Sequence, residues 1–475
     1  PIMLFSSVEF LFRFLPVFMI LYLISPAKYR NIVLLAGSLV FYGVGEPYFV
    51  LLLIFSIVVN YGLSRYMVWE PVAPIRNRTQ RREKRRKAAL LVSLIFDFSM
   101  LFLFKYWDFA AGSLNQLTGS ELVPLLSLSL PLGISFYTFQ MVSYQVDCYR
   151  GTIQKSVGIV SFAAYVCMFP QLIAGPIVRY DEVGERMISR RMRIRNLENG
   201  LKLFTLGLGF KVLLANQIGT LWNTIMSAGA GALHPAVAWL GAAAYSFQIY
   251  FDFWGYSVMA MGLGKMLGFR IPQNFDNPYA SRSISEFWRR WHITLGRWFR
   301  EYVYFPLGGS RKGWFRTGCN LFIVWTLTGL WHGADWNFVL WGLLFFVILT
   351  IEKSSYGRRL EQTRVLGRLY TLAIIPITWV VFAVTDIGQL AAYLGNMFGI
   401  QQTGVMVGIP QLLRYLQEYG FLLAACILFA TPFPIRWYDR WKDRWFAVAL
   451  LAVVFWFSVH EIQVGSNNPF LYFRF

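Results

Sequence analysis

The sequence predicts an all-α polytopic membrane protein, and its composition is the first reason. Of its 475 residues, 56% are hydrophobic and 14% are charged, and the mean hydropathy is +0.48. A soluble domain cannot bury so much apolar surface. At least four apolar windows can each cross a hydrocarbon core of ~30 Å; they are residues 47–64, 122–146, 156–178 and 212–251. The last window has no Asp, Glu, Lys or Arg and is long enough for two helices.

The N-terminal residues and the cysteines exclude two other classes of protein. Residues 14–24 are expected to form the first span rather than a signal peptide, because Arg13 is their lone basic flank and no clear small-residue cleavage site follows. The four cysteines lie far apart and form no C-x-x-C pair. We therefore expect neither a disulfide framework nor a metal site.

Basic residues mark the cytoplasmic loops. The formal net charge is +20, and Lys and Arg collect in short loops between apolar windows, as the positive-inside rule predicts, rather than in a nucleic-acid-binding patch. Residues 76–87 form the densest basic block and fix one side as cytoplasmic. The segment 156–178 either dips in and returns or forms two short pieces around Pro170 and Pro176. The other expected spans are 88–106, 203–226, 239–264, 369–385, 419–433 and 445–458.

This topology places the end of the sequence outside the cell membrane. It predicts a membrane domain at residues 1–459 and an extracytoplasmic tail at residues 460–475. The tail is rich in aromatic residues, so it either anchors in the membrane or fills a groove. Its Tyr472 is also a candidate covalent acyl carrier, once a base removes the phenolic proton. An extended chain spans ~3.3 Å per residue, so the tail can reach back into an outward-facing cavity.

One histidine lies in a stretch without charged side chains. Residues 317–334 contain no Asp, Glu, Lys or Arg, yet they include His332 in the run Gly-Leu-Trp-His-Gly. An ionisable group at membrane depth is costly and usually marks a functional site. A neutral imidazole can act there as a general base; the alternative is a hydrogen bond that ties helices together. We expect catalysis at His332, with Gly329 and Gly333 leaving room for a substrate passage.

The segment 283–311 is amphipathic. Ser283 followed by Glu286 forms a capping-box pattern, which predicts the start of a helix. Apolar side chains then recur along one face of an interfacial helix, and arginines occupy much of the rest. The apolar face holds Phe287, Trp291, Thr294, Leu295 and Trp298, and the arginines are Arg289, Arg290, Arg297 and Arg300.

Two interpretations of these arginines remain. As a surface anchor, the helix would place them on lipid headgroups. As a cytoplasmic mouth, it would gather a polyanionic donor such as coenzyme A, because guanidinium groups bind phosphate in a forked geometry. In the second interpretation Arg289, Arg290 and Trp291 contact the donor and His292 lies at the mouth. Taken alone, His292 also fits a structural role.

Asp252 is a carboxylate within an aromatic span, between Phe251 and Phe253. An unpaired charge is expensive at that depth. Asp252 therefore either hydrogen-bonds a neighbouring helix or lines a cavity. Together with Trp331, the neighbour of His332, it is a candidate for lining the substrate passage.

Jointly, these motifs resemble the membrane-bound O-acyltransferase family. The resemblance is to its bacterial branch, which contains alginate O-acetyltransferase, the peptidoglycan O-acetyl transporter and the teichoic-acid D-alanyl transfer protein. The matching blocks follow the expected order over most of the chain. They are residues 131–137, 147–150, 169–177, 250–256, 274–279, 286–292, 306–309 and 330–334.

The resemblance implies a fold and roles for several residues. The implied fold is a ring of tilted transmembrane helices around a thin centre, with a tunnel from a cytoplasmic donor site to an outer funnel. His332 matches the catalytic histidine, and His292 matches the second signature histidine near the cytoplasmic entrance. Val258 departs from the pattern, since alginate-type members often carry Asp there. Residues 470–475 also resemble a Phe-x-Tyr-Phe-x-Phe motif of related acylation systems, in which the tyrosine is proposed to carry the acyl group.

The sequence therefore predicts a metal-independent O-acyltransferase of the bacterial cytoplasmic membrane. Acetyl-CoA is the expected donor, and acetyl is expected to pass to Tyr472, to an extracytoplasmic serine hydrolase-like acetyltransferase, or to both in turn. The final acceptor is a polysaccharide of the cell surface or a secreted one. The alternatives are a family member that acylates a lipid or protein hydroxyl directly, and a transporter that uses intramembrane His and Asp without acyl chemistry.

Overall fold

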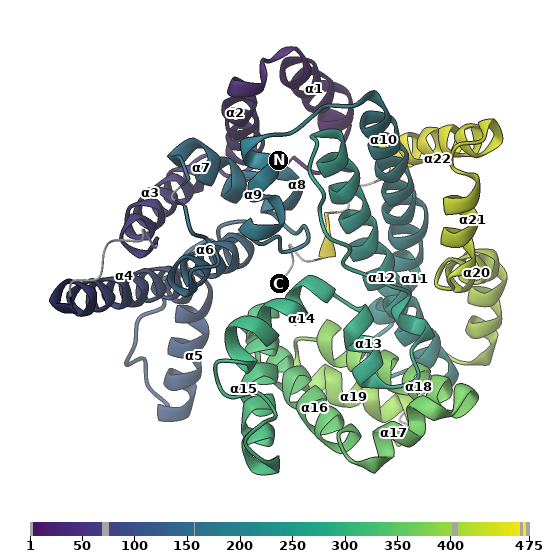
Figure 1. Ribbon diagram of the computed structural model, residues 1–475. Coiled ribbons are helices and arrows are strands. Elements are labelled where there is room, and N and C mark those ends of the chain that lie inside the picture. Colours follow the sequence, from purple (N-terminus) through teal and green to yellow (C-terminus); the bar gives the residue numbers. More distant parts are fainter. Residues whose placement is uncertain (1–2, 69–75, 156, 401–406, 466–468, 472–475) are drawn as a thin grey trace. The chain divides into compact units, whose positions relative to one another are not determined.

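A computed structural model describes residues 3–68, 76–155, 157–400, 407–465 and 469–471. Within these ranges the structure is helical, with one isolated bridge between Leu233 and Val407 in place of any sheet (Figure 1). The chain divides into two compact units. The first comprises residues 1–201 and 260–272, and the second comprises 202–259 and 273–475. The boundaries fall inside α10 (Ile194–Gly209) and α12 (Pro235–Met266).

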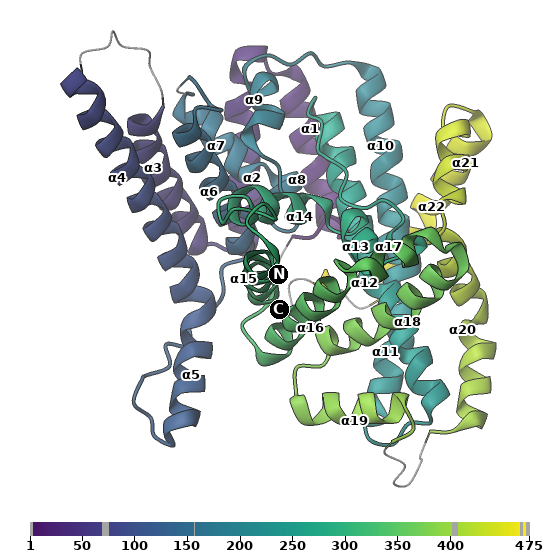
Figure 2. The same ribbon diagram turned by 60° about the horizontal axis from the view of Figure 1, so that its bottom comes forward.

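The first unit is built from antiparallel and broken helices. Its elements are η1 (Phe10–Phe14), α1 (Leu15–Ile24), η2 (Ala27–Tyr29), α2 (Arg30–Gly45), α3 (Phe49–Met67), α4 (Arg76–Leu101), η3 (Phe102–Tyr106), α5 (Trp107–Thr118), α6 (Ile134–Arg150), α7 (Ile159–Cys167), α8 (Phe169–Leu172) and α9 (Tyr180–Ile188). Figure 2 shows α4, η3 and α5 continuing as one long helix, with α3 packed alongside α4. Buried hydrogen bonds tie the helices together: Asn60 of α3 donates to Asp97 of α4 at 2.7 Å, and Gln145 of α6 donates to Asn60 at 2.7 Å. Such interhelical bonds satisfy polar groups away from water.

Two expected spans of the first unit differ in detail from the structure. The window 122–146 is helical only from Ile134. Residues 122–131 form an irregular segment, and a turn that includes Gly133 follows it. Gly133 has φ +74°, and a Cβ there would lie 2.6 Å from the carbonyl oxygen of Leu172, so this turn requires glycine. The segment 156–178 forms two short pieces, α7 and α8, as one of its two expected forms predicted.

The second unit contains the remaining helices. They are η4 (Phe210–Ala215), α11 (Asn216–Ser227), η5 (Pro278–Ala280), α13 (Ile284–Arg290), α14 (Ile293–Phe299), η6 (Arg300–Tyr304), α15 (Trp314–His332), α16 (Trp336–Glu352), α17 (Ser355–Gln362), α18 (Arg364–Ala383), α19 (Ile387–Met397), α20 (Ile409–Phe429), α21 (Phe433–Trp441) and α22 (Trp445–Val464). The last helix ends at Val464, so the expected boundary at residue 459 falls inside it.

The described helices confirm a multi-pass membrane protein. Six are long and apolar enough to cross a bilayer, and two shorter apolar helices accompany them. The six are Phe49–Met67, Gln80–Thr118, Ile194–Ser227, Arg364–Ala383, Ile409–Phe429 and Trp445–Val464, and each overlaps a span expected from the sequence. The shorter two are Phe10–Ile24 and Trp336–Glu352.

Candidate active site

His332 is the last residue of α15, and its imidazole is 4% exposed. Aromatic rings surround it: the ring centroids of Trp341, Trp331 and Phe382 lie 4.9, 5.1 and 5.2 Å from that of His332. Water is largely excluded from such an environment, which strengthens the electrostatic interactions formed inside it. The imidazole is therefore held at a dry, aromatic-walled position.

A hairpin of α15 and α16 fixes the place of His332. Gly333 ends α15 in an extended conformation, and Asp335 begins α16 by accepting a hydrogen bond from the Trp336 amide at 2.7 Å. A Cβ at Gly329 would lie 2.3 Å from the carbonyl oxygen of Phe338, and one at Gly333 would lie 2.1 Å from the Phe338 ring. These glycines therefore permit the close approach of α15 and α16, and the space beside them is filled by α16.

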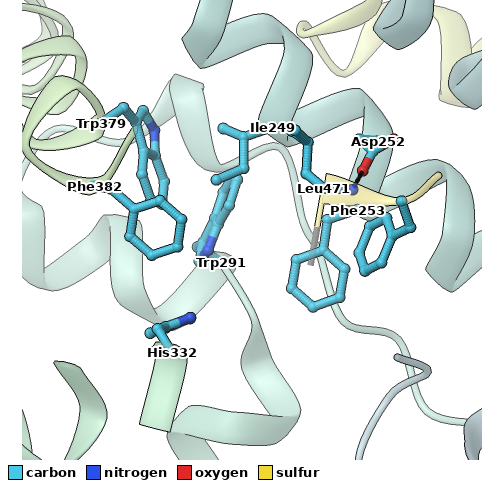
Figure 3. A pocket seen from close by; sticks show the side chains of 9 residues that line it. Ile249, Asp252, Phe253, Trp291, His332, Trp379, Phe382 and Leu471 are labelled. Atoms are coloured by element: carbon cyan, nitrogen blue, oxygen red, sulfur yellow. Dashed lines mark hydrogen bonds between the residues drawn. The ribbon is translucent and has the colours of Figure 1, made fainter. Parts of the chain in front are cut away.

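A small cavity adjoins His332, and we call it the His332 cavity. Its volume is about 10 Å³, which is room for about one water molecule. Figure 3 shows the side chains around it. The lining residues are Ile249, Asp252, Phe253, Trp291, His332, Trp379, Phe382, Phe470 and Leu471. Of the two residues expected to line a substrate passage, Asp252 lines this cavity and Trp331 is not among its lining residues.

Asp252 is ion-paired with Lys211 of η4. Both side chains are buried, with 2% and 5% of their surface exposed. Lys211 was not singled out by the sequence analysis, although it is the lone charged residue of the expected span 203–226. A lone cation and a lone carboxylate in two apolar spans are expected to pair. This pattern could have identified Lys211 as the partner of Asp252.

Close contact between two helices brings the pair together. A Cβ at Gly207 of α10 would lie 2.5 Å from the carbonyl oxygen of Gly255 in α12, and one at Gly255 would lie 2.7 Å from the carbonyl oxygen of Gly207. Small residues at such a crossing allow the backbones to approach closely. Lys211 follows Gly207 by one turn, as Asp252 precedes Gly255 by nearly one turn, so the crossing sets the two charges side by side.

His292 lies outside the His332 cavity. It has φ +45°, which breaks the expected single amphipathic helix into α13 and α14. Asn274 stabilises this corner, since its Oδ1 accepts hydrogen bonds from the Thr294 amide at 3.1 Å and the Thr294 hydroxyl at 2.9 Å and lies 3.2 Å from Nδ1 of His292. Burial lowers the pKa of His292 to about 3. The ring is therefore neutral at physiological pH, and it contacts Trp331 at 5.7 Å between centroids.

The start and the buried face of the predicted amphipathic segment agree with the structure. Ser283 caps α13 by accepting from the Glu286 amide at 2.9 Å. Glu352 of α16 accepts from the amides of Ile284 and Ser285, at 2.7 Å each, and so satisfies the first turn of α13. The five apolar positions predicted for one face are all buried.

A larger cavity lies between α13, α14, η6 and α15, and we call it the arginine cavity. Its volume is about 480 Å³. Its cationic lining residues are Arg289, Arg297, Arg300 and Lys353. Of the three expected donor contacts, only Arg289 lies here: Arg290 pairs with Glu286 at 2.7 Å, and Trp291 lines the His332 cavity. Arg289 also pairs with Glu361 at 2.8 Å.

Comparison with known proteins identifies the family of this chain. The model of the membrane-bound O-acyltransferase family matches residues 89–385, a range that includes His292, His332 and the arginines of the arginine cavity. The chain belongs to the membrane-bound O-acyltransferase family. It is therefore an enzyme that takes an acyl group from a donor, which sets aside the transporter alternative.

The relatives of this O-acyltransferase include bacterial cell-envelope enzymes. It is 36% identical to a probable alginate O-acetylase of Pseudomonas putida over the full length of both chains. It is 34% identical to the peptidoglycan O-acetyltransferase of Helicobacter pylori, over 100% of this chain and 98% of the relative. It is also 28% identical to the teichoic acid D-alanyltransferase of Bacillus subtilis, over 54% of this chain and 66% of the relative.

The C-terminal segment of the O-acyltransferase, which we define as residues 469–471, enters the site. Phe470 and Leu471 line the His332 cavity, and the Leu471 amide donates to Asp252 (Figure 3). Tyr472, the expected acyl carrier, lies outside the described residues. Leu471, the residue immediately before Tyr472, therefore lies at the His332 cavity.

Proposed function

We propose that this membrane O-acyltransferase moves acetyl from cytoplasmic acetyl-CoA to Tyr472. An extracytoplasmic serine hydrolase-like acetyltransferase then takes the acetyl group to a cell-surface or secreted polysaccharide. One observation carries the proposal: Leu471, the residue before Tyr472, lines the same cavity as His332. The described chain next to the candidate acceptor is thus close to the base, in a site from which water is largely excluded.

The relatives support a polysaccharide as the final acceptor. Their names assign O-acetylation of alginate and of peptidoglycan to two of them. Both relatives share at least 34% identity with this chain over nearly their whole length. We extend the same class of acceptor, a glycan hydroxyl outside the cytoplasmic membrane, to this chain.

The arginine cavity supports a phosphate-bearing donor. Coenzyme A carries several phosphate oxygens, which guanidinium groups bind through forked hydrogen bonds. Arg297, Arg300 and Lys353 line this cavity beside Arg289, so its cationic character does not depend on one side chain. The volume of about 480 Å³ is within the range of small-molecule sites. In this proposal the donor's phosphates bind in this cavity, and its thioester points toward His332.

His332 acts as the general base in the proposed transfer. Its imidazole takes the phenolic proton of Tyr472, and the phenolate oxygen attacks the thioester carbonyl carbon. The C–S bond breaks as the new C–O ester bond forms, and the imidazolium returns the proton to the departing thiolate. The aromatic wall of Trp341, Phe382 and Trp379 keeps bulk water away from the new ester, which protects it from hydrolysis.

Mass spectrometry of the purified full-length protein after incubation with acetyl-CoA tests the proposal. We expect an acetyl mass increment on the C-terminal peptide of the wild type and none in His332→Ala. Tyr472→Phe is the matched control, because it keeps the ring and removes the acceptor oxygen. An increment that persists in His332→Ala would contradict the role of the histidine. Full polysaccharide acetylation by Tyr472→Phe would instead show direct transfer to the partner enzyme.

A further inference from the structure

We propose that Lys211 and Asp252 form a clamp for the peptide backbone. The clamp recognises main-chain atoms of the C-terminal segment (residues 469–471) and fixes its register over the His332 cavity. This role deepens the proposed function, on which it rests for the part played by Tyr472. Lys211 and Asp252 are positioning residues here, because they act on the acceptor segment and not on the reacting atoms.

Each member of the ion pair makes one bond to the other and one to the segment. The ammonium of Lys211 donates to Oδ1 of Asp252 and to the carbonyl oxygen of Pro469, the latter at 3.4 Å. Oδ2 of Asp252 accepts from the amide of Leu471 at 2.8 Å. The segment therefore supplies one acceptor to Lys211 and one donor to Asp252.

Burial makes these bonds important for the pair. With the segment bound, Lys211 and Asp252 have 5% and 2% of their side-chain surface exposed, so water contributes little to their hydrogen bonding in this state. A buried ion pair is tolerated only when its remaining donors and acceptors are also satisfied. The C-terminal segment completes that requirement, which gives a physical reason for the segment to remain bound at this place.

One aromatic side chain sets the register of the segment. Phe470 stacks on Tyr256 with ring centroids 5.0 Å apart, and it contacts Phe253 at 5.5 Å. Both partners belong to α12, the helix that carries Asp252. A shift of the segment by one residue would place Pro469 or Leu471 against these rings and lose the aromatic contact, which is worth more than its buried area alone.

The clamp thus divides recognition between backbone and side chain. The hydrogen bonds of Asp252 and Lys211 go to main-chain atoms of Leu471 and Pro469, so they do not depend on the identity of these two side chains. Phe470 supplies the side-chain selectivity. Leu471, the last described residue, lies at the wall of the His332 cavity.

Residue-resolved hydrogen–deuterium exchange of the full-length protein in nanodiscs tests the clamp without any acyl donor. The paired variant Lys211→Met with Asp252→Leu removes both charges and leaves neither buried alone, so the fold is expected to persist. We expect the Leu471 amide to be protected in the wild type and to exchange roughly tenfold faster or more in the paired variant, the scale of a lost charge-assisted hydrogen bond.

A second Lys–Asp pair provides the matched control. Lys202 and Asp443 are paired at 3.3 Å, and neither lines the His332 cavity. Lys202→Met with Asp443→Leu should leave the exchange of the Leu471 amide unchanged. Equal exchange of that amide in the wild type and in the Lys211/Asp252 paired variant would overturn the clamp.

Acetylation of Tyr472 separates the clamp from the proposed function. Leu471→Pro removes the amide proton that Asp252 accepts, whereas Leu471→Val keeps it. With acetyl-CoA, we expect the acetyl increment to fall roughly tenfold or more in Leu471→Pro relative to Leu471→Val. Clamp-dependent protection without any acetyl on wild-type Tyr472 would sink the acyl relay and leave the clamp standing. Acetylation without protection of the Leu471 amide would do the reverse.

Discussion

The two cavities of the second unit differ in size, lining and electrostatics. The His332 cavity is about 10 Å³ and is walled by aromatic rings, one ion pair and the C-terminal segment. The arginine cavity is about 480 Å³ and is lined by four cationic side chains. In the proposed reaction, the first cavity holds the base and the second binds the polyanionic donor. The proposal thus assigns bond formation and donor binding to two different cavities.

This separation predicts that variants of the two cavities change different kinetic constants. Variants of the His332 cavity should lower kcat, because they act on the chemical step or on the acceptor. Variants of the arginine cavity should raise KM for the donor, because they act on binding. The predictions that follow run from the largest expected effect to the smallest.

His332→Ala should lower kcat for CoA release by about 10²–10⁴-fold, the usual contribution of a general base. KM for acetyl-CoA should change little, since His332 does not line the arginine cavity. Steady-state kinetics of CoA release would measure both constants. A higher KM with an unchanged kcat would mean that His332 acts on donor binding rather than on the chemical step.

Lys211→Met should destabilise the protein by about 3–5 kcal/mol, because it leaves the Asp252 carboxylate buried without its cation. Thermal unfolding in detergent would measure this as a lower midpoint. Lys202→Met is the control, because its partner Asp443 is 60% exposed and can be solvated, so that change should cost about 1 kcal/mol or less. Equal losses in the two variants would contradict the importance of burial at Asp252.

The double variant Arg297→Gln with Arg300→Gln should raise KM for acetyl-CoA about tenfold, as expected for lost charge-assisted bonds to phosphate. Titration of acetyl-CoA at two salt concentrations would measure it, and the wild type should show the steeper salt dependence. A lower kcat at unchanged KM would place these arginines in the chemical step instead.

Arg289→Gln should have the smallest effect, about 0–1 kcal/mol, because its ion pair with Glu361 is 61% and 41% exposed. The hydrogen bond from Arg289 lowers the pKa of Glu361, so this contribution is present at neutral pH and is lost as pH falls through the lowered value. Unfolding midpoints at neutral and acidic pH would show the variant and the wild type converging in acid. A difference that grows in acid would exclude the ion pair as its source.

The apolar spans were predictable from the sequence, because burial in lipid needs long runs without charge. Each of the six described candidate spans overlaps an expected one. The irregular segment 122–131 was not predicted, since its composition is as apolar as that of a helix. Its turn depends on contact between Gly133 and Leu172, and one window of sequence carries no information about that contact.

The candidate site was predictable in its residues but not in its geometry. His332 and Asp252 were found because ionisable groups stand out in apolar runs. The corner at His292 was not predicted, because its left-handed backbone is stabilised by Asn274, which lies outside the amphipathic segment 283–311. Lys211 was overlooked because its partner lies 41 residues away, although the two lone charges could have been paired.

The bonds that complete the Lys211–Asp252 pair join residues far apart in the order of synthesis. Leu471 follows Asp252 by 219 residues and Pro469 follows Lys211 by 258. Lys211 and Asp252 are therefore synthesised long before the segment that completes their hydrogen bonds, and until it binds, these groups need other partners, such as water. We therefore expect the His332 cavity to close late in membrane assembly, when residues 469–471 bind.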